Sequence, residues 1–417
     1  MSEKPASGND IRMRGFRDRA LVETALEWID DRTEPLTGEN VDYSAAHHRV
    51  LAADVTSPLD VPAFDRSAMD GFALRGAETE GAGDYNPLTL KVIGEALPGQ
   101  PFDGQVSKGR AVRIMTGAPL PDGADAVLPA EYATQTDNSV EVTATVAPEK
   151  NVGRKGEDVT AGEVLLKSGR KLRPQDIGLL GSVGLTRVSA VRRPKVRLVV
   201  TGNELIKPGE PLGTYQIYES NSSMLRGLIT RDGAELESQC DVVDDRDEIQ
   251  KAIVSPGADV VLVSGGSSVG QEDHAPSILK EVGELAIHGI AMRPSSPTGI
   301  GCIGETLVCL LPGNPVSCLC AYDFFAGRAI RLMGGRSGDW PYARTTAVLA
   351  KKLVSAIGRV DYCRVAIEND SVRPLALSGA SILSSTTRAD GFVIVPHELE
   401  GYAPGTELEV YLYDSVN

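Results

Sequence analysis

The chain has 417 residues and a mass of 44.2 kDa, which predicts two to four domains because single domains have about 100–200 residues. It carries 42 basic and 57 acidic residues, a formal charge of −15, and this argues against a nucleic-acid partner, which would need a basic surface. No apolar run approaches the about 20 residues needed to cross a bilayer, so a membrane-spanning protein is excluded.

The start of the chain and the cysteines point to a reducing compartment. Residues 1–19 mix Ser, Lys, Arg and Gly without an apolar centre, so they do not fit a secretory signal, and we expect a cytoplasmic protein. The six cysteines stand mostly inside apolar runs, as reduced core residues do. Cys318 and Cys320 are one residue apart, which is the wrong spacing for a redox or zinc motif.

The first part of the chain predicts a helix and then a β-rich domain. Apolar residues recur at helical spacing from Leu21 to Ile29, after a capping residue at Asp18. Short β-type runs broken by Pro and Gly fill residues 61–148 and indicate an inserted β-rich domain. A linker-like stretch at 149–158 and a short helix from Pro174 follow. We expect residues 14–60 and 149–190 to form one discontinuous helical and extended domain.

From residue 191 the chain alternates strands and helices. Nearly continuous apolar strands at 196–200, near 242, at 259–263 and at 306–311 alternate with predicted helices after 221, after 247, from 276 and over 315–333. This pattern is typical of a parallel, doubly wound α/β domain, here over 191–336. Short alternating runs return over 337–417 and predict a C-terminal β-barrel or sandwich. The expected fold class is therefore a multidomain α/β protein.

Polar loops directly follow four of the predicted strands. Ligands of open α/β sheets bind at the carboxyl ends of the strands, so these loops are expected to converge on one site. They are Thr201–Glu204, Asp244–Asp245, Ser264–Gly270 and Pro312–Pro315. The Ser264–Gly270 loop offers backbone N–H groups before a helix, which suits a phosphate, although such a loop is also an ordinary strand-to-helix turn.

Three acids follow different strands of the predicted sheet. Glu204, Asp244 and Asp273 would together form a carboxylate cluster able to hold Mg²⁺ through oxygen ligands. Each acid alone also fits a solvated loop charge or a helix cap. His274 and His288 lack the spacing of a zinc helix motif, so a zinc enzyme is not supported.

Two segments of the β-rich region carry further polar groups. Residues 60–74 are polar and irregular, and we expect a structured loop that displays Asp65, Ser67 and Asp70. Residues 113–119 predict a strand that ends in the hydroxyl of Thr116 and a tight turn. A plain hairpin is the alternative for the second segment.

Several motifs together resemble one family, the molybdenum-insertion enzymes of molybdenum-cofactor synthesis, called MoeA in bacteria and present as the E domain of gephyrin. They occur in the family's order and cover most of the chain from Leu21. The matching segments are DVPAFDRSAMDGFAL at 60–74, RIMTGAPLPDGADAV at 113–127, VVTGNEL at 199–205, YESNSSML at 218–225, VSGGSSVGQEDH at 263–274 and LPGNPVS at 311–317.

This resemblance implies an activity and partners. Adenylylated molybdopterin and molybdate are the expected substrates, molybdenum cofactor and AMP the products, and Mg²⁺ the assisting cation. The family resemblance also implies a homodimer whose active site lies between the subunits. Contacts with the molybdopterin adenylyltransferase and with recipient molybdoenzymes would supply the substrate and take the product.

The resemblance also implies roles for individual residues. The expected catalytic residues are Asp70, Thr116, Glu204, Asp244 and Asp273, of which Glu204 and Asp273 are the expected metal ligands. The expected cofactor pocket comprises Ser220, Asn221, Ser264, Gly265, Gly266, Ser268, Gly270, Pro312, Asn314, Pro315 and Ser317. The expected molybdate residues are Arg293, Ser296, Pro297, Arg359, Arg364 and Ser385. An arginine suits an oxyanion because its donors form a fixed fork.

One departure from the family pattern leaves alternatives open. Where the family commonly reads Lys-Pro-Gly-Lys-Pro, this chain has Arg293-Pro-Ser-Ser296-Pro, so one cation is replaced by Arg and another is lost. A carrier that binds the pterin with impaired metal insertion is therefore one alternative. A molybdopterin adenylyltransferase is a second, which the additional domains disfavour, and a tungstate-inserting enzyme is a third.

Overall fold

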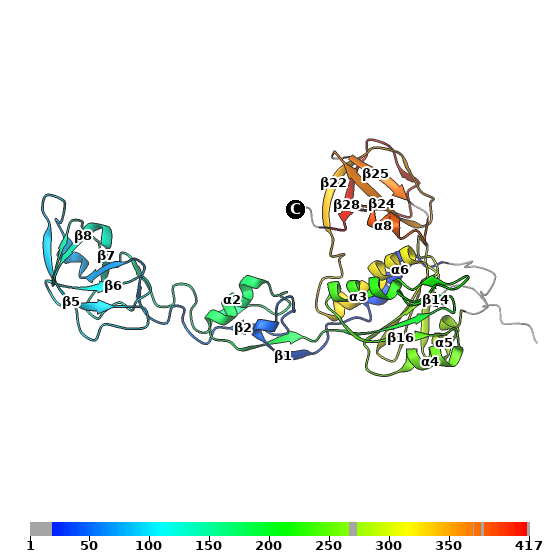
Figure 1. Cartoon of the computed structure of the whole chain (residues 1–417), viewed down its shortest axis with the longest axis horizontal. Coiled ribbons are helices and arrows are strands. Elements are labelled where there is room, and N and C mark those ends of the chain that lie inside the picture. The colour runs from blue at the N-terminus through cyan, green and yellow to red at the C-terminus, as the bar shows by residue number, and fades with distance from the viewer. Residues whose placement is uncertain (1–18, 267–272, 370, 377–378, 415–417) are drawn as a thin grey trace, which may run out of the picture. The chain divides into compact units, whose positions relative to one another are not determined.

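The computed structural model describes residues 19–266, 273–369, 371–376 and 379–414. Contacts divide the chain into two units, which Figure 1 shows in the colours of the sequence. One unit combines the chain up to Glu39 with the chain from Val191, and the other comprises Asn40–Ala190. None of the helices in the described part of the chain has the length and apolarity that crossing a bilayer requires.

The α/β domain contains a six-stranded sheet with the order β16-β13-β17-β21-β20-β18. Its strands are β13 Lys195–Thr201, β16 Glu235–Val242, β17 Val260–Ser264, β18 Glu284–His288, β20 Gly299–Ile303 and β21 Thr306–Leu311. The first four strands in this order are parallel, as predicted. The prediction of an all-parallel sheet is wrong at the other edge, where β20 pairs antiparallel with both β21 and β18. A two-residue turn at Gly304, where φ is 57°, reverses the chain between β20 and β21.

Helices cover both faces of this sheet, which confirms the doubly wound arrangement. They are α1 Val22–Asp30, α3 Asn221–Asp232, α4 Arg246–Val254, α5 Ala275–Val282, α6 Pro315–Ala321 and α7 Gly327–Met333. One apolar core contains side chains of α1, α3, α6 and α7, and the other contains side chains of α4 and α5. A π-helical turn, Tyr322–Ala326, joins α6 to α7, so the predicted helix over 315–333 is continuous but not regular.

The first helix packs differently from the sequence expectation. It begins at Val22 after Leu21 as its N-cap, and Asp18 lies outside the described residues. Its buried side chains, Val22, Ala25 and Ile29, belong to the core of the α/β domain. The apolar face of α1 therefore stabilises the α/β domain.

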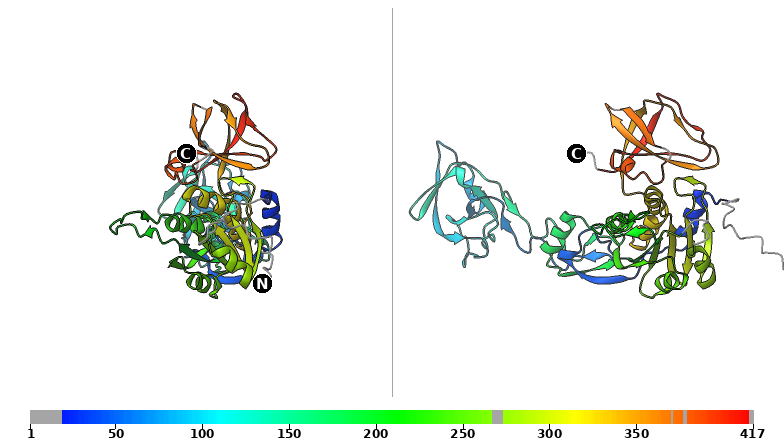
Figure 2. Two further views of the ribbon diagram at one scale, coloured as in Figure 1. Left: turned by 90° about the vertical axis from the view of Figure 1, so that its right-hand side faces the viewer. Right: turned by 45° about the vertical axis from the view of Figure 1, so that its right-hand side comes forward.

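The C-terminal residues form a barrel-like β domain, as predicted. The sheet order is β19-β24-β25-β22-β28-β26, and an additional pairing of β26 with β24 closes the strands on one another. The members are β19 Met292–Arg293, β22 Ala343–Leu349, β24 Val360–Glu368, β25 Ser371–Ala376, β26 Gly391–Val395 and β28 Glu407–Leu412. The short β23 Leu353–Val354 pairs with β27 Gly401–Tyr402, and α8 spans Ser384–Thr387. Figure 2 shows the strands from β22 onward in orange and red.

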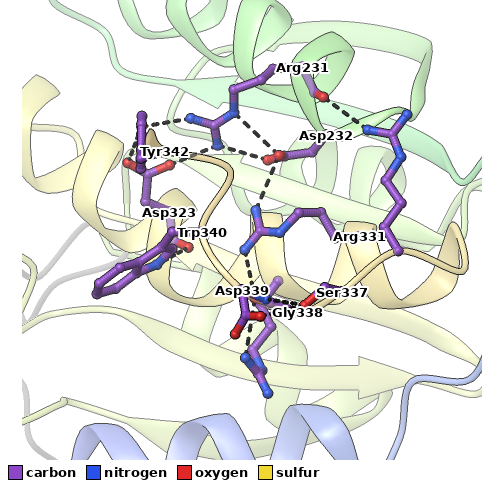
Figure 3. A network of polar contacts seen from close by, with 11 residues as sticks. Arg231, Asp232, Asp323, Arg331, Ser337, Gly338, Asp339, Trp340 and Tyr342 are labelled. Atoms are coloured by element: carbon purple, nitrogen blue, oxygen red, sulfur yellow. Dashed lines mark hydrogen bonds and ion pairs between the residues drawn. The ribbon is translucent and has the colours of Figure 1, made fainter. Parts of the chain in front are cut away.

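A buried network of charges links the connection after α7 to the α/β domain (Figure 3). Arg231 of α3 donates from Nη2 to Asp232 and to Asp323, both at 2.9 Å. Tyr342 donates to the second oxygen of Asp323 at 2.8 Å, and the indole of Trp340 donates to the Asp323 carbonyl at 3.1 Å. Burial raises the pKa of Asp323, while Arg231 opposes that shift. The chain entering the C-terminal domain is thus fixed to α3 and to the π-helical turn.

The second unit contains a six-stranded sheet with the order β7-β4-β6-β5-β9-β8. Its strands are β4 Gly71–Leu74, β5 Leu88–Ala96, β6 Arg110–Ile114, β7 Ala126–Pro129, β8 Ala133–Thr136 and β9 Ser139–Val142. The expectation that residues 60–74 form a displayed loop is wrong for Gly71–Leu74, which is a buried strand of this sheet. Ser67 is also buried, and its hydroxyl donates to the carbonyl of Met69.

The remaining part of the second unit has a small core of its own. It contains β1 Gly38–Asp42, β2 Val55–Thr56, β11 Val164–Leu166, α2 Pro174–Ser182 and β12 Arg187–Val191. Leu51, Leu166, Leu172 and Leu180 are buried together there. The stretch read as a linker includes β10 Val152–Gly153, which pairs with β3 Arg66–Ser67.

Candidate functional site

A cavity of about 750 Å³ lies at the carboxyl ends of the parallel strands. Residues of the loops after β13, β17 and β21 line it together with the start of α3. The convergence of strand-end loops that the sequence predicts is therefore present. The lining residues that were predicted are Glu204, Ser220, Asn221, Asp244, Ser264, Gly265, Gly266, Asp273, Pro297, Pro312, Asn314 and Pro315.

Asn221, the first residue of α3, joins the loops after two strands. Its side-chain nitrogen donates to Oγ of Ser264 at 3.0 Å and to the carbonyl oxygen of Gly313 at 2.8 Å. The helix end is also fixed by Glu219, which accepts a hydrogen bond from the backbone N–H of Ser222 at 2.8 Å. Glu219 thereby satisfies a backbone donor that the first helical turn would leave without a partner.

The loop after β17 approaches β13 closely because it begins with two glycines. Gly265 has φ of 100°, and a Cβ at that position would lie 2.2 Å from the carbonyl oxygen of Thr201. No other residue type fits that position without a backbone shift. Gly266 also has a positive φ, 55°. Ser268 and Gly270, which were expected to bind the cofactor, lie outside the described residues.

The three predicted acids line the cavity but have different surroundings. Asp244 accepts hydrogen bonds from the hydroxyl of Thr201 and from the backbone N–H of Asn203, the latter at 3.1 Å. These bonds attach Asp244 to the loop after β13. Glu204 and Asp273 contribute to the lining from the loop after β13 and from the segment before α5. Within the described ranges, no group of three or more His, Cys, Asp or Glu side chains could hold a metal ion by itself.

The loop after β21 starts helix α6 and also lines the large cavity. Asn314 is the N-cap of α6 and Pro315 its first residue, a position that proline favours because its missing N–H would have no partner there. Pro312, Asn314 and Pro315 nevertheless line the large cavity. Ser317 is buried and does not line it, but it lines a second, neighbouring cavity.

This second cavity has a volume of about 350 Å³ and shares Pro297, Pro312 and Asn314 with the first. Arg293 and Ser296, two of the predicted molybdate residues, line it together with Ser317. The two cavities are therefore adjoining parts of one site. Ser295, at the position of the glycine in the family pattern, has φ of 86° and donates to the carbonyl of Ser317 at 2.5 Å.

Arg293 and Arg359 meet at a buried carboxylate. Nη2 of Arg293 donates to Oδ2 of Asp361 at 2.5 Å, and Nε of Arg359 lies 3.2 Å from Oδ1 of the same residue. Arg364 is completely buried in β24, and Ser385 donates within the α8 region to the carbonyl of Ile382 at 2.6 Å. Among the described residues, the linings of the two cavities do not include Arg359, Arg364 or Ser385.

Asp70 and Thr116, also predicted as catalytic, contact each other in the second unit. Asp70 accepts hydrogen bonds from the backbone N–H and from the hydroxyl of Thr116, both at 2.7 Å. These bonds hold the pKa of Asp70 below its ordinary value. Nearby, the half-buried Asp65 accepts from Arg154 at 2.6 Å, so the carboxylates of Asp65 and Asp70 are both held in fixed orientations.

The sequence reasoning missed several residues of the site. Tyr218 and Glu219 line the large cavity, although they lie before α3 and not after a strand of the main sheet. Ser381 and Leu383 line it from the C-terminal domain, and no motif marks them. Asp361 lies between two arginines of the Gly-Arg-Val-Asp-Tyr-Cys-Arg segment. That position between two cations could have indicated an ion pair with an arginine of the site.

Comparisons with known proteins match all parts of the chain. Residues 20–184 match the MoeA N-terminal region (domain I and II), residues 197–331 a probable molybdopterin binding domain, and residues 346–413 the MoeA C-terminal region (domain IV). A molybdopterin molybdenumtransferase of Haemophilus influenzae is 33% identical over 94% of this chain and 97% of its own length.

The chain belongs to the MoeA family. A putative molybdopterin biosynthesis protein of Methanocaldococcus jannaschii is 32% identical over 95% of this chain and 96% of its own length. The crystal structure of a molybdopterin biosynthesis MoeA protein from Pyrococcus horikoshii is similar with a TM-score of 0.82 and 34% identity, covering 96% of this chain and all of that chain. The resemblance that the motifs indicate is confirmed, and this member of the MoeA family shares its relatives' domain content over nearly its whole length.

Proposed function

We propose that this protein is a molybdopterin molybdotransferase. It takes adenylylated molybdopterin and molybdate, and it releases AMP and molybdenum cofactor. The observation that carries the proposal is the pair of adjoining cavities, of which the larger has the loops and acids expected for a pterin nucleotide and the smaller has an arginine. Such an arrangement suits a reaction between a pyrophosphate-linked substrate and a small oxyanion.

The larger cavity is proposed to bind the pterin and its phosphates. The backbone at Gly265 lies close to the end of β13, and its N–H donates to the carbonyl of Leu311 at 3.2 Å, while α3 starts beside this loop at Asn221. The first N–H groups of a helix have no partner within the helix, so a helix start favours anionic groups. We propose that Ser264, Gly265, Gly266, Asn221 and Asn314 orient the substrate, with Ser220, Pro312 and Pro315 shaping the walls and Ser317 acting from the neighbouring cavity.

A divalent cation is proposed to assist at Glu204 and Asp273. Mg²⁺ usually binds through one or two carboxylates together with substrate phosphates and waters, so a cage formed by protein alone is not required. Two acids in the lining of the large cavity fit that requirement. When bound, the cation would neutralise charge on the pyrophosphate. The two carboxylates hold the cation, and Asp244 keeps the Thr201 loop in position.

The smaller cavity is proposed to receive molybdate. Arg293 supplies a charged planar donor, and Ser296 supplies a hydroxyl. Pro297 lies on the boundary shared with the larger cavity, where an oxyanion could meet the pterin. Arg359, Arg364 and Ser385 are proposed to support this site from the C-terminal domain.

Asp70 and Thr116 are proposed to act in a homodimer. We propose that the second unit of one subunit contributes these residues to the cavity of the other. The protein is further proposed to act in the cytoplasm, to receive its substrate from a molybdopterin adenylyltransferase and to pass its product to molybdoenzymes.

The test is turnover by the purified protein with adenylylated molybdopterin, Mg²⁺ and molybdate, followed by activation of an apo-molybdoenzyme. Molybdate-dependent AMP release together with enzyme activation supports the proposal. Tight pterin binding without AMP release would favour a carrier, which the loss of the family's second lysine at Ser296 motivates. Replacing molybdate by tungstate in the same assay tests the tungstate alternative.

A further inference from the structure

We propose that Asp361 is a positioning residue for oxyanion binding, which acts by holding the guanidinium of Arg293 in place. The inference rests on the proposed function and deepens it. The residues expected to bind molybdate are mostly arginines and serines. Asp361 is itself negatively charged, so it can assist oxyanion binding only through neighbouring side chains.

Strand pairing places Asp361 beside Arg293. The two strands β19 and β24 pair in parallel, with Arg293 opposite Asp361 in the register. β19 leaves the α/β domain and β24 belongs to the C-terminal barrel. The contact between the two residues is therefore made across the junction of these two domains.

The carboxylate of Asp361 is fully buried, accepts two hydrogen bonds and forms an ion pair with a second arginine. Oδ2 accepts from Nη2 of Arg293 at 2.5 Å and from the hydroxyl of Ser355 at 2.6 Å. Nε of Arg359 lies 3.2 Å from Oδ1. Hydrogen bonds between charged groups are stronger than neutral ones, and they orient an arginine fork as well as attract it. Asp361 therefore restricts the direction in which the Arg293 guanidinium points.

The orientation of the guanidinium leaves its buried Nε without an acceptor in the described part of the chain. Across the residues that the structure describes, the buried Nε of Arg293 and the buried Oγ of Ser296 have no hydrogen-bond partner. Both residues line the 350 Å³ cavity. Buried polar atoms without partners are costly, and an anion with several acceptor oxygens would satisfy both. Asp361 itself is absent from the described lining, which identifies it as a supporting group and not a ligand.

The main experiment compares the wild-type protein with Asp361→Asn, which keeps the size of the side chain and removes its charge. Binding of molybdate alone and of tungstate alone is measured by calorimetry, and kcat and the molybdate KM are measured by AMP release. We expect Kd and KM to rise about tenfold with kcat within about twofold, as for other groups that orient a ligand-binding side chain. Unchanged oxyanion binding would overturn the inference, because Asp361 would then have no effect on the site. Tighter binding would also overturn it, because Asp361 would then act only as a repelling charge.

A double-mutant cycle separates positioning from a general structural role. In the Arg293→Ala background, Asp361→Asn should change the oxyanion Kd no further, because the group it orients is gone. A similar tenfold change in both backgrounds would overturn the inference. Unfolding midpoints without oxyanion show whether the variants fold.

A milder variant keeps the test decisive if Asp361→Asn fails to fold. Ser355→Ala removes one hydrogen bond to the same carboxylate oxygen and leaves every charge in place. It should raise the oxyanion Kd about two- to threefold, and no change would contradict the inference. If the wild-type protein binds neither oxyanion and releases no AMP, the proposed function fails as well. If the wild-type protein binds an oxyanion normally and the variants bind it equally well, only the role of Asp361 is removed.

Discussion

Asn221 connects two loops of the large cavity, since its side-chain nitrogen lies 3.0 Å from Oγ of Ser264 and 2.8 Å from the carbonyl oxygen of Gly313. These loops follow different strands, β17 and β21. One amide at the start of α3 therefore fixes the distance between the glycine-rich loop and the Pro-Gly-Asn-Pro loop. The shape of the proposed pterin site depends on this residue.

Replacing Asn221 by alanine should weaken both folding and substrate binding. The residue is 8% exposed, so its loss removes a donor from the buried hydroxyl of Ser264 and from the Gly313 carbonyl and should lower the free energy of unfolding by about 1–3 kcal/mol. We also expect the KM for adenylylated molybdopterin to rise about tenfold. Urea unfolding and steady-state kinetics measure the two effects. A variant with wild-type stability and KM would show that Asn221 does not organise the loops.

Glu204 and Asp244 should respond differently to loss of charge. Glu204→Gln should lower kcat for AMP release at least about 100-fold with little change in stability, because its proposed role is to hold the cation. Asp244→Asn should destabilise the loop through its contacts with Thr201 and Asn203 and lower kcat less. Kinetics at several Mg²⁺ concentrations together with unfolding curves distinguish the two. Equal effects of the two variants on kcat and stability would contradict the division of roles.

Ser296 offers a test by gain of function. Ser296→Lys restores the cation of the family pattern in a cavity of about 350 Å³. An added positive charge near a dianion should lower the molybdate KM by about five- to tenfold at low ionic strength, and less in salt. The matched control is Ser296→Met, which adds length without charge. A lower KM in both variants, or in neither, would contradict a role for charge at this position.

Thr116 should control the protonation of Asp70. Its N–H and hydroxyl both donate to Asp70 and hold the pKa of that carboxyl below its ordinary value. Thr116→Val removes the hydroxyl, so the pKa of Asp70 should rise toward that of a free aspartate. Because the folded-state pKa is depressed, its contribution to stability is present above the unfolded-state pKa and is lost as pH falls through the folded value. Carboxyl NMR titration of both proteins measures the shift, and identical titration curves would refute the assignment.

The sequence indicated much of the large cavity because strand ends can be recognised locally. Val263 before Ser264 and Leu311 before Pro312 mark the points where buried strands end, and parallel strands must deliver such loops to one edge. The antiparallel β20 was missed because its sequence, Gly-Ile-Gly-Cys-Ile, contains glycines that do not favour strands. Gly301 is nevertheless required there, since a Cβ would lie 1.9 Å from the carbonyl oxygen of Glu284.

The support of the small cavity by Asp361 could not be predicted from the sequence, because Asp361 is distant along the chain from the lining residue Arg293. Arg293 and Asp361 are brought together only by the pairing of β19 with β24. Nothing in the local pattern of a two-residue strand predicts its partner. The same limit applied to α1, whose apolar face fits any core and was assigned to the wrong neighbour.

The most direct test of the account is the stoichiometry of the reaction with increasing molybdate. Purified protein is incubated with adenylylated molybdopterin and Mg²⁺, and AMP and molybdenum bound to pterin are both measured. We predict that AMP release requires molybdate, saturates, and yields about one molybdenum-bound pterin for each AMP. AMP release independent of molybdate, or pterin binding without AMP release, would contradict the proposed molybdotransferase.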